Sequence, residues 1–91
     1  MKVKVYVVTI MFRRDDTVLR VEGVYSTKTR AKEKLAELRE KTLDEYKDEY
    51  DEDEYEIGTD IPTLFEITHT EEEIWDEILV TEKVIDADDD N

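Results

Sequence analysis

The sequence predicts an α+β fold in which one main helix packs on one face of an antiparallel sheet of three to four strands, in the order β-β-α-β-β. Three features support this: two strand-like segments joined by a polar turn, one segment with helical spacing of apolar residues, and two later apolar segments. At 91 residues the chain can bury one modest core. We therefore expect a single α+β domain over residues 1–86 and a disordered acidic tail over residues 87–91.

The first two strands are expected to form a β-hairpin. Residues 2–12 are rich in Val, Ile, Tyr and Phe, residues 17–25 (TVLRVEGVY) alternate more visibly, and the polar connection RRDD lies between them. Arg13 and Arg14 at the tip are most simply solubilising turn residues. A turn centred between Arg14 and Asp15 would set the register of the two strands.

That register predicts which side chains share a face of the sheet. Ile10 would lie opposite Leu19, and Tyr6 opposite Gly23, which would make room for the tyrosine ring or mark a β-bulge. The side chains expected on one face are those of Tyr6, Val8, Ile10, Phe12, Leu19, Val21 and Tyr25.

The other face of the hairpin is unusually apolar for a surface in water. Its expected apolar members are Val3, Val5, Val7, Met11, Val18 and Val24, diluted by Thr9, Arg20 and Glu22. Either the later chain or another molecule should cover part of it. The candidates for a dimer face are Val3, Val5 and Val7.

A helix is predicted over residues 28–42, with Ser26 or Thr27 as its N-cap. The apolar residues with the spacing of one helical face are Ala31, Leu35 and Leu38. Tyr46 and Tyr50 continue this face, so the helix could extend to about Tyr50. Two like-charge pairs at i, i+4 oppose the extension, Asp44/Asp48 and Glu45/Glu49. The sequence therefore does not decide whether residues 43–57 form a helix or a loop.

The second half of the chain contains two further strand-like segments. Gly58 and Pro62 break the pattern before residues 63–69 (TLFEITH), which are a predicted third strand. Residues 70–76 combine a capping-box pattern with apolar residues, and we favour a turn or a single helical turn there. A fourth strand is then expected over residues 77–85.

The net charge of −14 is distributed very unevenly. Residues 1–42 contain eleven Lys/Arg and six Asp/Glu, whereas residues 43–91 contain two and twenty-one. The acidic half should repel nucleic acid and anionic membranes, so neither is an expected partner, and a basic partner is. The chain has no cysteine, which fits a cytoplasmic location. No apolar segment reaches the roughly 20 residues that span a bilayer.

Catalytic and metal-binding patterns are missing from the sequence. His69 is the only histidine, and it is expected to be a surface residue at the end of a strand. A calcium loop opening at Asp51 would need glycine at its sixth position, which is Glu56. Two glycines in the whole chain cannot form a glycine-rich phosphate loop. We expect no catalytic residue, no metal ligand and no cofactor, and we do not expect an enzyme.

The strongest candidate for a functional site is the acidic run, residues 43–57 (LDEYKDEYDEDEYEI). A row of carboxylates can imitate a row of phosphates, because arginine and lysine side chains bind both. Its tyrosines, with Trp75, could serve either as core packing or as aromatic anchors of an interface. The candidate partner-binding residues are Asp44, Glu45, Asp48, Glu49, Tyr50, Asp51, Glu52, Asp53, Glu54, Tyr55 and Trp75. A second acidic row would consist of Glu71, Glu72, Glu73, Asp76 and Glu77.

The segments KVYVVT and VEGVYSTKTRAKEKLAEL resemble a class of small uncharacterised proteins from bacteria and their phages. The resemblance covers residues 2–38 and is most specific in GVYSTKTRAKEKL. It implies a phage or mobile-element accessory protein. Small acidic proteins of this kind often look like inhibitors of host defence, such as anti-CRISPR or anti-restriction proteins.

Charge and resemblance together lead to two expectations about function. The first is a non-enzymatic acidic inhibitor that mimics nucleic acid and blocks the basic nucleic-acid-binding surface of a host nuclease or CRISPR effector, in the cytoplasm of the host cell. The alternative is a small structural or adaptor module that forms a homodimer through its sheet, with acids that serve only solubility.

Overall fold

The computed structural model describes residues 1–86 as a helix packed on a five-stranded sheet. The elements are β1 (Lys2–Arg13), β2 (Thr17–Tyr25), α1 (Lys28–Glu49), a short 3-10 helix η1 (Glu52–Glu54), β3 (Tyr55–Ile61), β4 (Leu64–His69) and β5 (Trp75–Asp86). The strands lie in the order β2-β1-β5-β4-β3, and all neighbours are antiparallel. The α+β class with one helix is confirmed. The expected tail over residues 87–91 lies outside the described residues.

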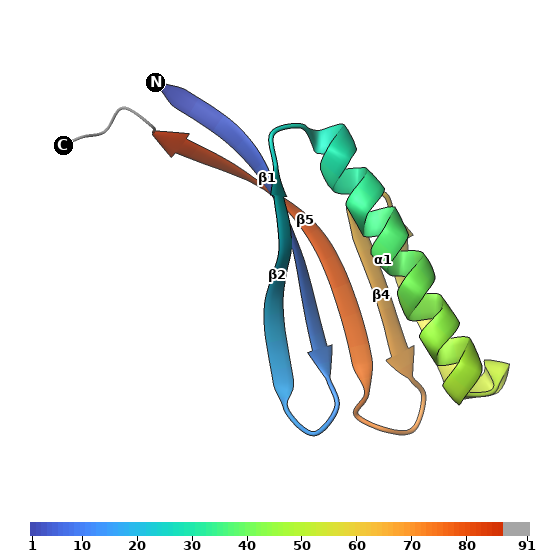
Figure 1. Ribbon diagram of the computed structural model, residues 1–91. Coiled ribbons are helices and arrows are strands. Elements are labelled where there is room, and N and C mark those ends of the chain that lie inside the picture. The colour runs from blue at the N-terminus through green and yellow to red at the C-terminus, as the bar shows by residue number, and fades with distance from the viewer. Residues whose placement is uncertain (87–91) are drawn as a thin grey trace.

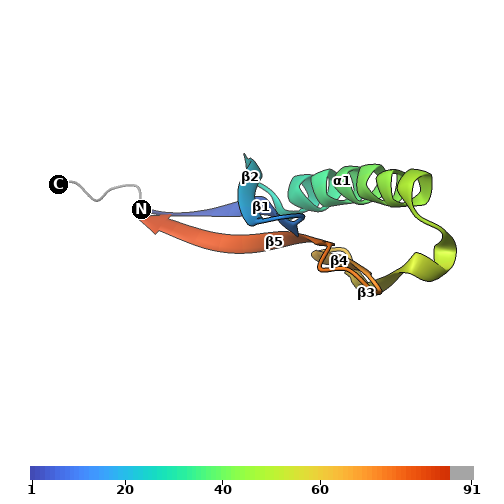
Figure 2. The same ribbon diagram turned by 90° about the horizontal axis from the view of Figure 1, so that it is seen from below.

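The molecule has two layers (Figures 1 and 2). Helix α1 covers one face of the sheet, and the opposite face, which we call the open face, has no element of residues 1–86 packed on it. The first residues of β1 and the last of β5 run on together past the start of the helix, so the two ends of the described chain lie side by side. Because there are only two layers, the smallest extent of the molecule is 17 Å.

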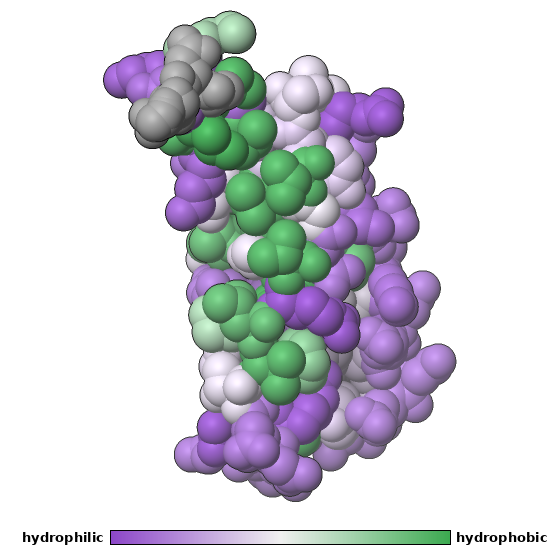
Figure 3. Space-filling model, turned by 60° about the vertical axis from the view of Figure 1, so that its left-hand side comes forward, coloured by the Kyte–Doolittle hydropathy of each residue, from purple (hydrophilic) through white to green (hydrophobic). Residues whose placement is uncertain are grey.

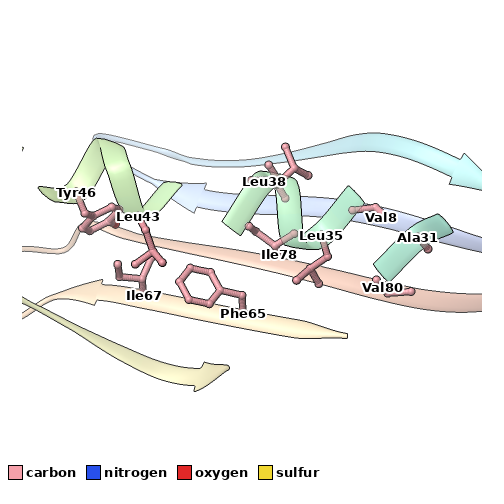
Figure 4. Close-up of a cluster of buried hydrophobic side chains, with 11 residues drawn as sticks. Val8, Ala31, Leu35, Leu38, Leu43, Tyr46, Phe65, Ile67, Ile78 and Val80 are labelled. Atoms are coloured by element: carbon pink, nitrogen blue, oxygen red, sulfur yellow. The ribbon is translucent and has the colours of Figure 1, made fainter. Parts of the chain in front are cut away.

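The hydrophobic core lies between α1 and the three middle strands (Figure 4). The helix contributes its inward-facing residues, and β1, β4 and β5 contribute alternate residues from one face of the sheet. The buried apolar residues are Val8, Ile10, Ala31, Leu35, Leu38, Leu43, Tyr46, Phe65, Ile67, Ile78 and Val80. The predicted helical face and the predicted inner face of β1 are thus both confirmed.

Helix α1 begins after Thr27, whose side-chain oxygen accepts a hydrogen bond from the N–H of Arg30 at 3.3 Å. It continues through the first half of the acidic run and ends before Tyr50, which confirms the longer of the two expected helices. Each like-charge pair at i, i+4 costs only about 0.2–0.5 kcal/mol. Burial of the Tyr46 ring, which is 1% exposed, contributes more, because a large buried side chain stabilises by about 1.5–3 kcal/mol.

The expectation of three to four strands is wrong because it omits β3. Gly58 and Pro62 suggested a loop, yet residues on both sides of Gly58 pair with β4, and the register shifts between Ile57 and Asp60. Pro62 falls in the two-residue connection between β3 and β4. Gly58 therefore lies at an irregularity within an edge strand, and Pro62 lies in the turn that follows it. The last strand, β5, begins at Trp75, two residues earlier than expected.

The register of the first hairpin also differs from the expected one. Arg13 pairs with Thr17, so Ile10 lies opposite Arg20 and Leu19 lies opposite Met11. A shift of one residue moves side chains to the other face of a strand. Leu19 and Val21 therefore lie on the open face, where they are 65% and 58% exposed, rather than over the core.

A β-bulge next to Gly23 shifts the register back, so Tyr25 at the end of β2 lies on the helix-side face, as predicted. Val8 pairs with Gly23 and Thr9 with Val21, which leaves Glu22 as the extra residue. The aromatic ring beside Gly23 belongs to Tyr25, not Tyr6 as the hairpin register suggested. A Cβ added at Gly23 would lie 2.6 Å from the Tyr25 hydroxyl oxygen, so glycine lets that ring lie across the strand.

Candidate functional site: an acidic end on a tyrosine cluster

The acidic run forms the last two turns of α1, then η1 and the start of β3. Helical periodicity separates its residue types: Tyr46 points into the core, whereas the carboxylates on the same helix are exposed. The exposed carboxylates of the run are Asp44, Glu45, Asp48, Glu49, Asp51, Glu52, Asp53 and Glu56, and Glu54 is half-buried. The backbone of an ordered helix and a 3-10 turn thus holds most of the candidate residues.

The tyrosines of the acidic run pack together under the carboxylates. The ring of Tyr46 lies 5.6 Å from the rings of both Tyr50 and Tyr55, measured between centroids. The Tyr50 ring in turn meets the His69 ring at 4.7 Å in an edge-to-face arrangement. We call these four residues the tyrosine cluster. Their spacing in the sequence follows from packing against the core, which both Tyr50 and Tyr55 contact from its rim.

Tyr46 also joins a polar network between α1, β5 and the first hairpin. Its hydroxyl donates to Oδ1 of Asp76 at 2.9 Å, and the Arg14 guanidinium donates to the same oxygen at 2.9 Å. The guanidinium carbon of Arg14 lies 5.8 Å from the centre of the Tyr46 ring. Arg14 is therefore an anchor between elements rather than only the solubilising turn residue that was expected, and Asp76 does not belong to an exposed acidic row.

His69 is buried, with only 7% of its surface exposed, and this corrects the expected surface histidine. Its Nδ1 accepts hydrogen bonds from the backbone N–H groups of Glu71 and Glu72, both at 3.1 Å. The N–H of Thr70 donates to the carbonyl of Glu54 at 2.9 Å. These bonds hold the β4–β5 loop beside η1. Sequence reasoning missed this role, because nothing in the pattern of TLFEITH indicates which groups surround its last residue.

The loop adds a second group of carboxylates to those of the acidic run. Glu71, Glu72 and Glu73 are exposed on the loop. With the exposed carboxylates of residues 44–53 they form what we call the acidic end of the molecule. Glu77, expected in the same row, lies instead on the open face, directly opposite Glu66 of β4.

The acidic end is curved rather than a straight row. Glu45, Asp48 and Glu49 line a shallow hollow with Arg14 on one flank of the helix. On the other flank, Glu52 lines a separate hollow with basic residues, including Lys47. A partner that contacts every carboxylate must therefore wrap around the end of α1.

The remaining candidates lie on the open face, on the other side of the sheet from α1. Trp75 is half-buried at the start of β5, paired with Arg13 of β1 and Thr68 of β4, and by strand alternation its side chain belongs to the open face. The alternate residues of β1 place the three candidates for a dimer face on the same open face, Val3, Val5 and Val7. The structure thus brings the carboxylates together but separates them from Trp75 and the valines.

No three His, Cys, Asp or Glu side chains within residues 1–86 are arranged to hold a metal ion.

Across the same described residues, no helix combines the length and the apolar character needed to cross a lipid bilayer.

The stability of the protein is expected to fall as the pH rises above about 10. Burial, and then the Asp76 carboxylate, raise the pKa of Tyr46 above its ordinary value of 10.0. In the unfolded chain Tyr46 ionises near pH 10, while in the folded protein it stays protonated. Its contribution is therefore complete below pH 10 and is lost above it. Urea denaturation between pH 8 and about 11 should show a steeper loss for wild type than for Tyr46→Phe, and equal slopes would contradict this assignment.

The structure defines a small α+β protein with one helix on a five-stranded antiparallel sheet and an acidic end. A family model described as Domain of unknown function (DUF7336) matches residues 3–76, and the chain belongs to this family. No curated protein and no solved structure matches the chain. The family description is consistent with the expected small uncharacterised protein and states no activity.

Proposed function

We propose that this protein is a non-enzymatic inhibitor whose acidic end occupies the basic nucleic-acid-binding surface of another protein, such as a host nuclease or CRISPR effector. The observation that supports the proposal is the ordered display of carboxylates above the tyrosine cluster. A solvated run kept only for solubility needs no fixed backbone. Here the run forms the end of α1, η1 and the start of β3, its tyrosines are packed inward, and most of its carboxylates are exposed.

The geometry suits the imitation of a phosphate backbone. Acidic residues at i and i+4 on a helix have their Cβ atoms about 5–6 Å apart, and arginine and lysine side chains of a nucleic-acid groove can meet a row of carboxylates with this spacing. The curvature around the end of α1 suits a concave basic surface. A net charge of −14 would also speed the encounter with such a surface at low salt. The chain has no cysteine and so needs no disulfide, which suits the reducing cytoplasm where these targets work.

Charge reversal tests the proposal. Asp44, Asp48 and Asp53 are exposed, and their side chains make no ion pair within residues 1–86, so lysine at all three should leave the fold intact. Immobilised wild type should capture a nucleic-acid-binding protein from nuclease-treated bacterial lysate at about 50 mM salt and release it at about 500 mM. Added DNA or RNA should displace it. The triple variant should bind the captured protein at least about tenfold more weakly.

The matched control reverses three exposed carboxylates nearer the start of the same helix, Glu33, Glu37 and Glu40. Both triple variants change the net charge equally, so a difference between them reports position rather than total charge. The ion pairs lost in the control, such as Lys34 with Glu37, are exposed and contribute little. Equal binding by the two variants, or a captured protein that nucleic acid does not displace, would contradict the proposal.

A further inference from the structure

The open face carries much of the exposed apolar surface of the protein. Figure 3, seen from the β2 side of the molecule, shows apolar side chains gathered in a long band that runs along most of its length. The exposed apolar side chains that strand alternation places on the open face are Val3, Leu19, Val21, Val24, Ile61 and Ile85. Contiguous exposed apolar patches of a few hundred Å² often mark a site of interaction with another molecule.

The charges on the open face are arranged differently from those on the rest of the chain. One part of the open face consists of the open-face residues of β5 between Leu79 and Ile85 and the residues of β1 and β2 beside them. This part contains no carboxylate, and its one charged residue is Lys83. Lys83 makes no ion pair within residues 1–86. At the other end of β5 the same face carries Glu77, opposite Glu66. A chain rich in acids thus keeps a neutral centre here. Lys83 lies toward one end, and toward the other lie the pair Glu66 and Glu77 and, beyond it on the same face, Arg13 and Glu56.

We infer that two copies of this chain associate through their open faces about a twofold axis that crosses β5 near Val80, so that Lys83 of each copy meets Glu77 and Glu66 of the other. Residues 77 and 83 lie about 20 Å apart along the strand. A twofold axis that lies between the two sheets, perpendicular to β5, reverses the direction of β5 in the second copy. It thereby brings the Lys83 side chain of each copy over the acidic pair of the other. Both contacts form together because the arrangement is self-complementary.

Two further features favour this arrangement. It places the two acidic ends at opposite ends of the dimer, which keeps like charges apart. It also supplies a cation to Glu77, whose pKa is raised by burial and by the neighbouring Glu66. Packed sheets keep their strands aligned within about 30° at a separation of about 10 Å, and a lysine side chain can accommodate the remaining offset.

The size of the face sets the expected strength of the dimer. Four strands about 4.8 Å apart and eight residues long give a flat footprint on the order of 500 Å² per copy. This footprint is toward the small end of specific interfaces, which bury about 800 Å² per partner. We therefore expect a reversible dimer whose population depends on protein concentration.

Sedimentation equilibrium over a wide concentration range tests the inference. Wild type should show a monomer–dimer equilibrium. Val5→Glu, which puts a carboxylate on the open face directly opposite Lys83 of the same copy and so competes for that lysine, should abolish the dimer. Lys83→Glu should raise the dimer dissociation constant at least about tenfold, and the swap Lys83→Glu with Glu77→Lys should restore it. Lys4→Glu, on the helix side of the same strand pair, is the control of equal charge and should have little effect.

Circular dichroism and thermal unfolding of each variant would separate a lost dimer from a lost fold. A wild type that stays monomeric at the highest concentration would overturn the inference, and binding of an apolar dye to that monomer would indicate a different partner for the open face. A dimer that survives Val5→Glu would also overturn it. Failure of the charge swap to restore a dimer would exclude the twofold register. None of these results depends on the proposed inhibitory function.

Discussion

Replacing Tyr46 by alanine is expected to lower the free energy of unfolding by about 3–5 kcal/mol, the range for removing a large aromatic side chain from a core. Tyr46 is 1% exposed, its ring contacts two other tyrosines, and its hydroxyl bonds to Asp76. The substitution therefore leaves a cavity and removes a donor from the mostly buried carboxylate of Asp76. Urea or guanidinium denaturation at neutral pH measures the loss.

Tyr50→Ala is the matched control for this prediction. Tyr50 belongs to the same cluster but lies at the rim of the core, where it is only partly buried. The neighbouring side chains and water can fill part of the space that its ring leaves, so a loss of about 1–2 kcal/mol is expected. Equal losses for the two variants would mean that Tyr46 does not hold the centre of the cluster.

The variant Tyr46→Ala also tests the proposed function. Tyr46→Ala keeps every carboxylate of the acidic end but removes the contact that holds the last turns of α1 on the sheet. Amide hydrogen exchange over residues 44–50 should become faster, because that segment loses its main buried side chain. If the ordered display of carboxylates matters for binding, Tyr46→Ala should weaken capture of a basic partner. Unchanged capture would favour a purely electrostatic, unstructured interaction.

Local patterns in the sequence were sufficient to predict the helix and most strands. The helix follows from an N-cap and from the spacing of Ala31, Leu35 and Leu38, and all three are buried. The edge strand β3 was missed because half of its residues are polar and Gly58 interrupts it. An edge strand packs one side only against a neighbour, so it needs little of the apolar alternation that identifies a central strand.

The site was less predictable than the fold, because its critical contacts join residues far apart in the chain. Asp76 looked like one more exposed acid, yet it accepts from Tyr46, thirty residues earlier. His69 gave no sign of burial before the position of Tyr50 was known. The hairpin register differed by one residue, since alternation in β2 fits either face until the bulge at Glu22 is placed.

Replacing Asp76 by alanine is expected to destabilise the fold by about 2–3 kcal/mol. Removing one partner of a fully buried ion pair costs about 3–5 kcal/mol. Here the Asp76 side chain is 12% exposed but that of Arg14 is 43% exposed, so water solvates the abandoned guanidinium and lowers the cost. The Tyr46 hydroxyl also loses its acceptor. Denaturation curves of wild type and Asp76→Ala at neutral pH measure this loss.

A double-mutant cycle with Tyr46→Phe assigns the loss to the network. If the hydroxyl of Tyr46 stabilises the fold through Asp76, Tyr46→Phe should cost about 1 kcal/mol in wild type and close to nothing in the Asp76→Ala background. Arg14→Ala should show the same dependence on Asp76. Additive losses would mean that the three side chains act separately. A strong coupling would make Asp76 the residue of β5 that holds both the end of α1 and the tip of the first hairpin, and with them the scaffold of the acidic end.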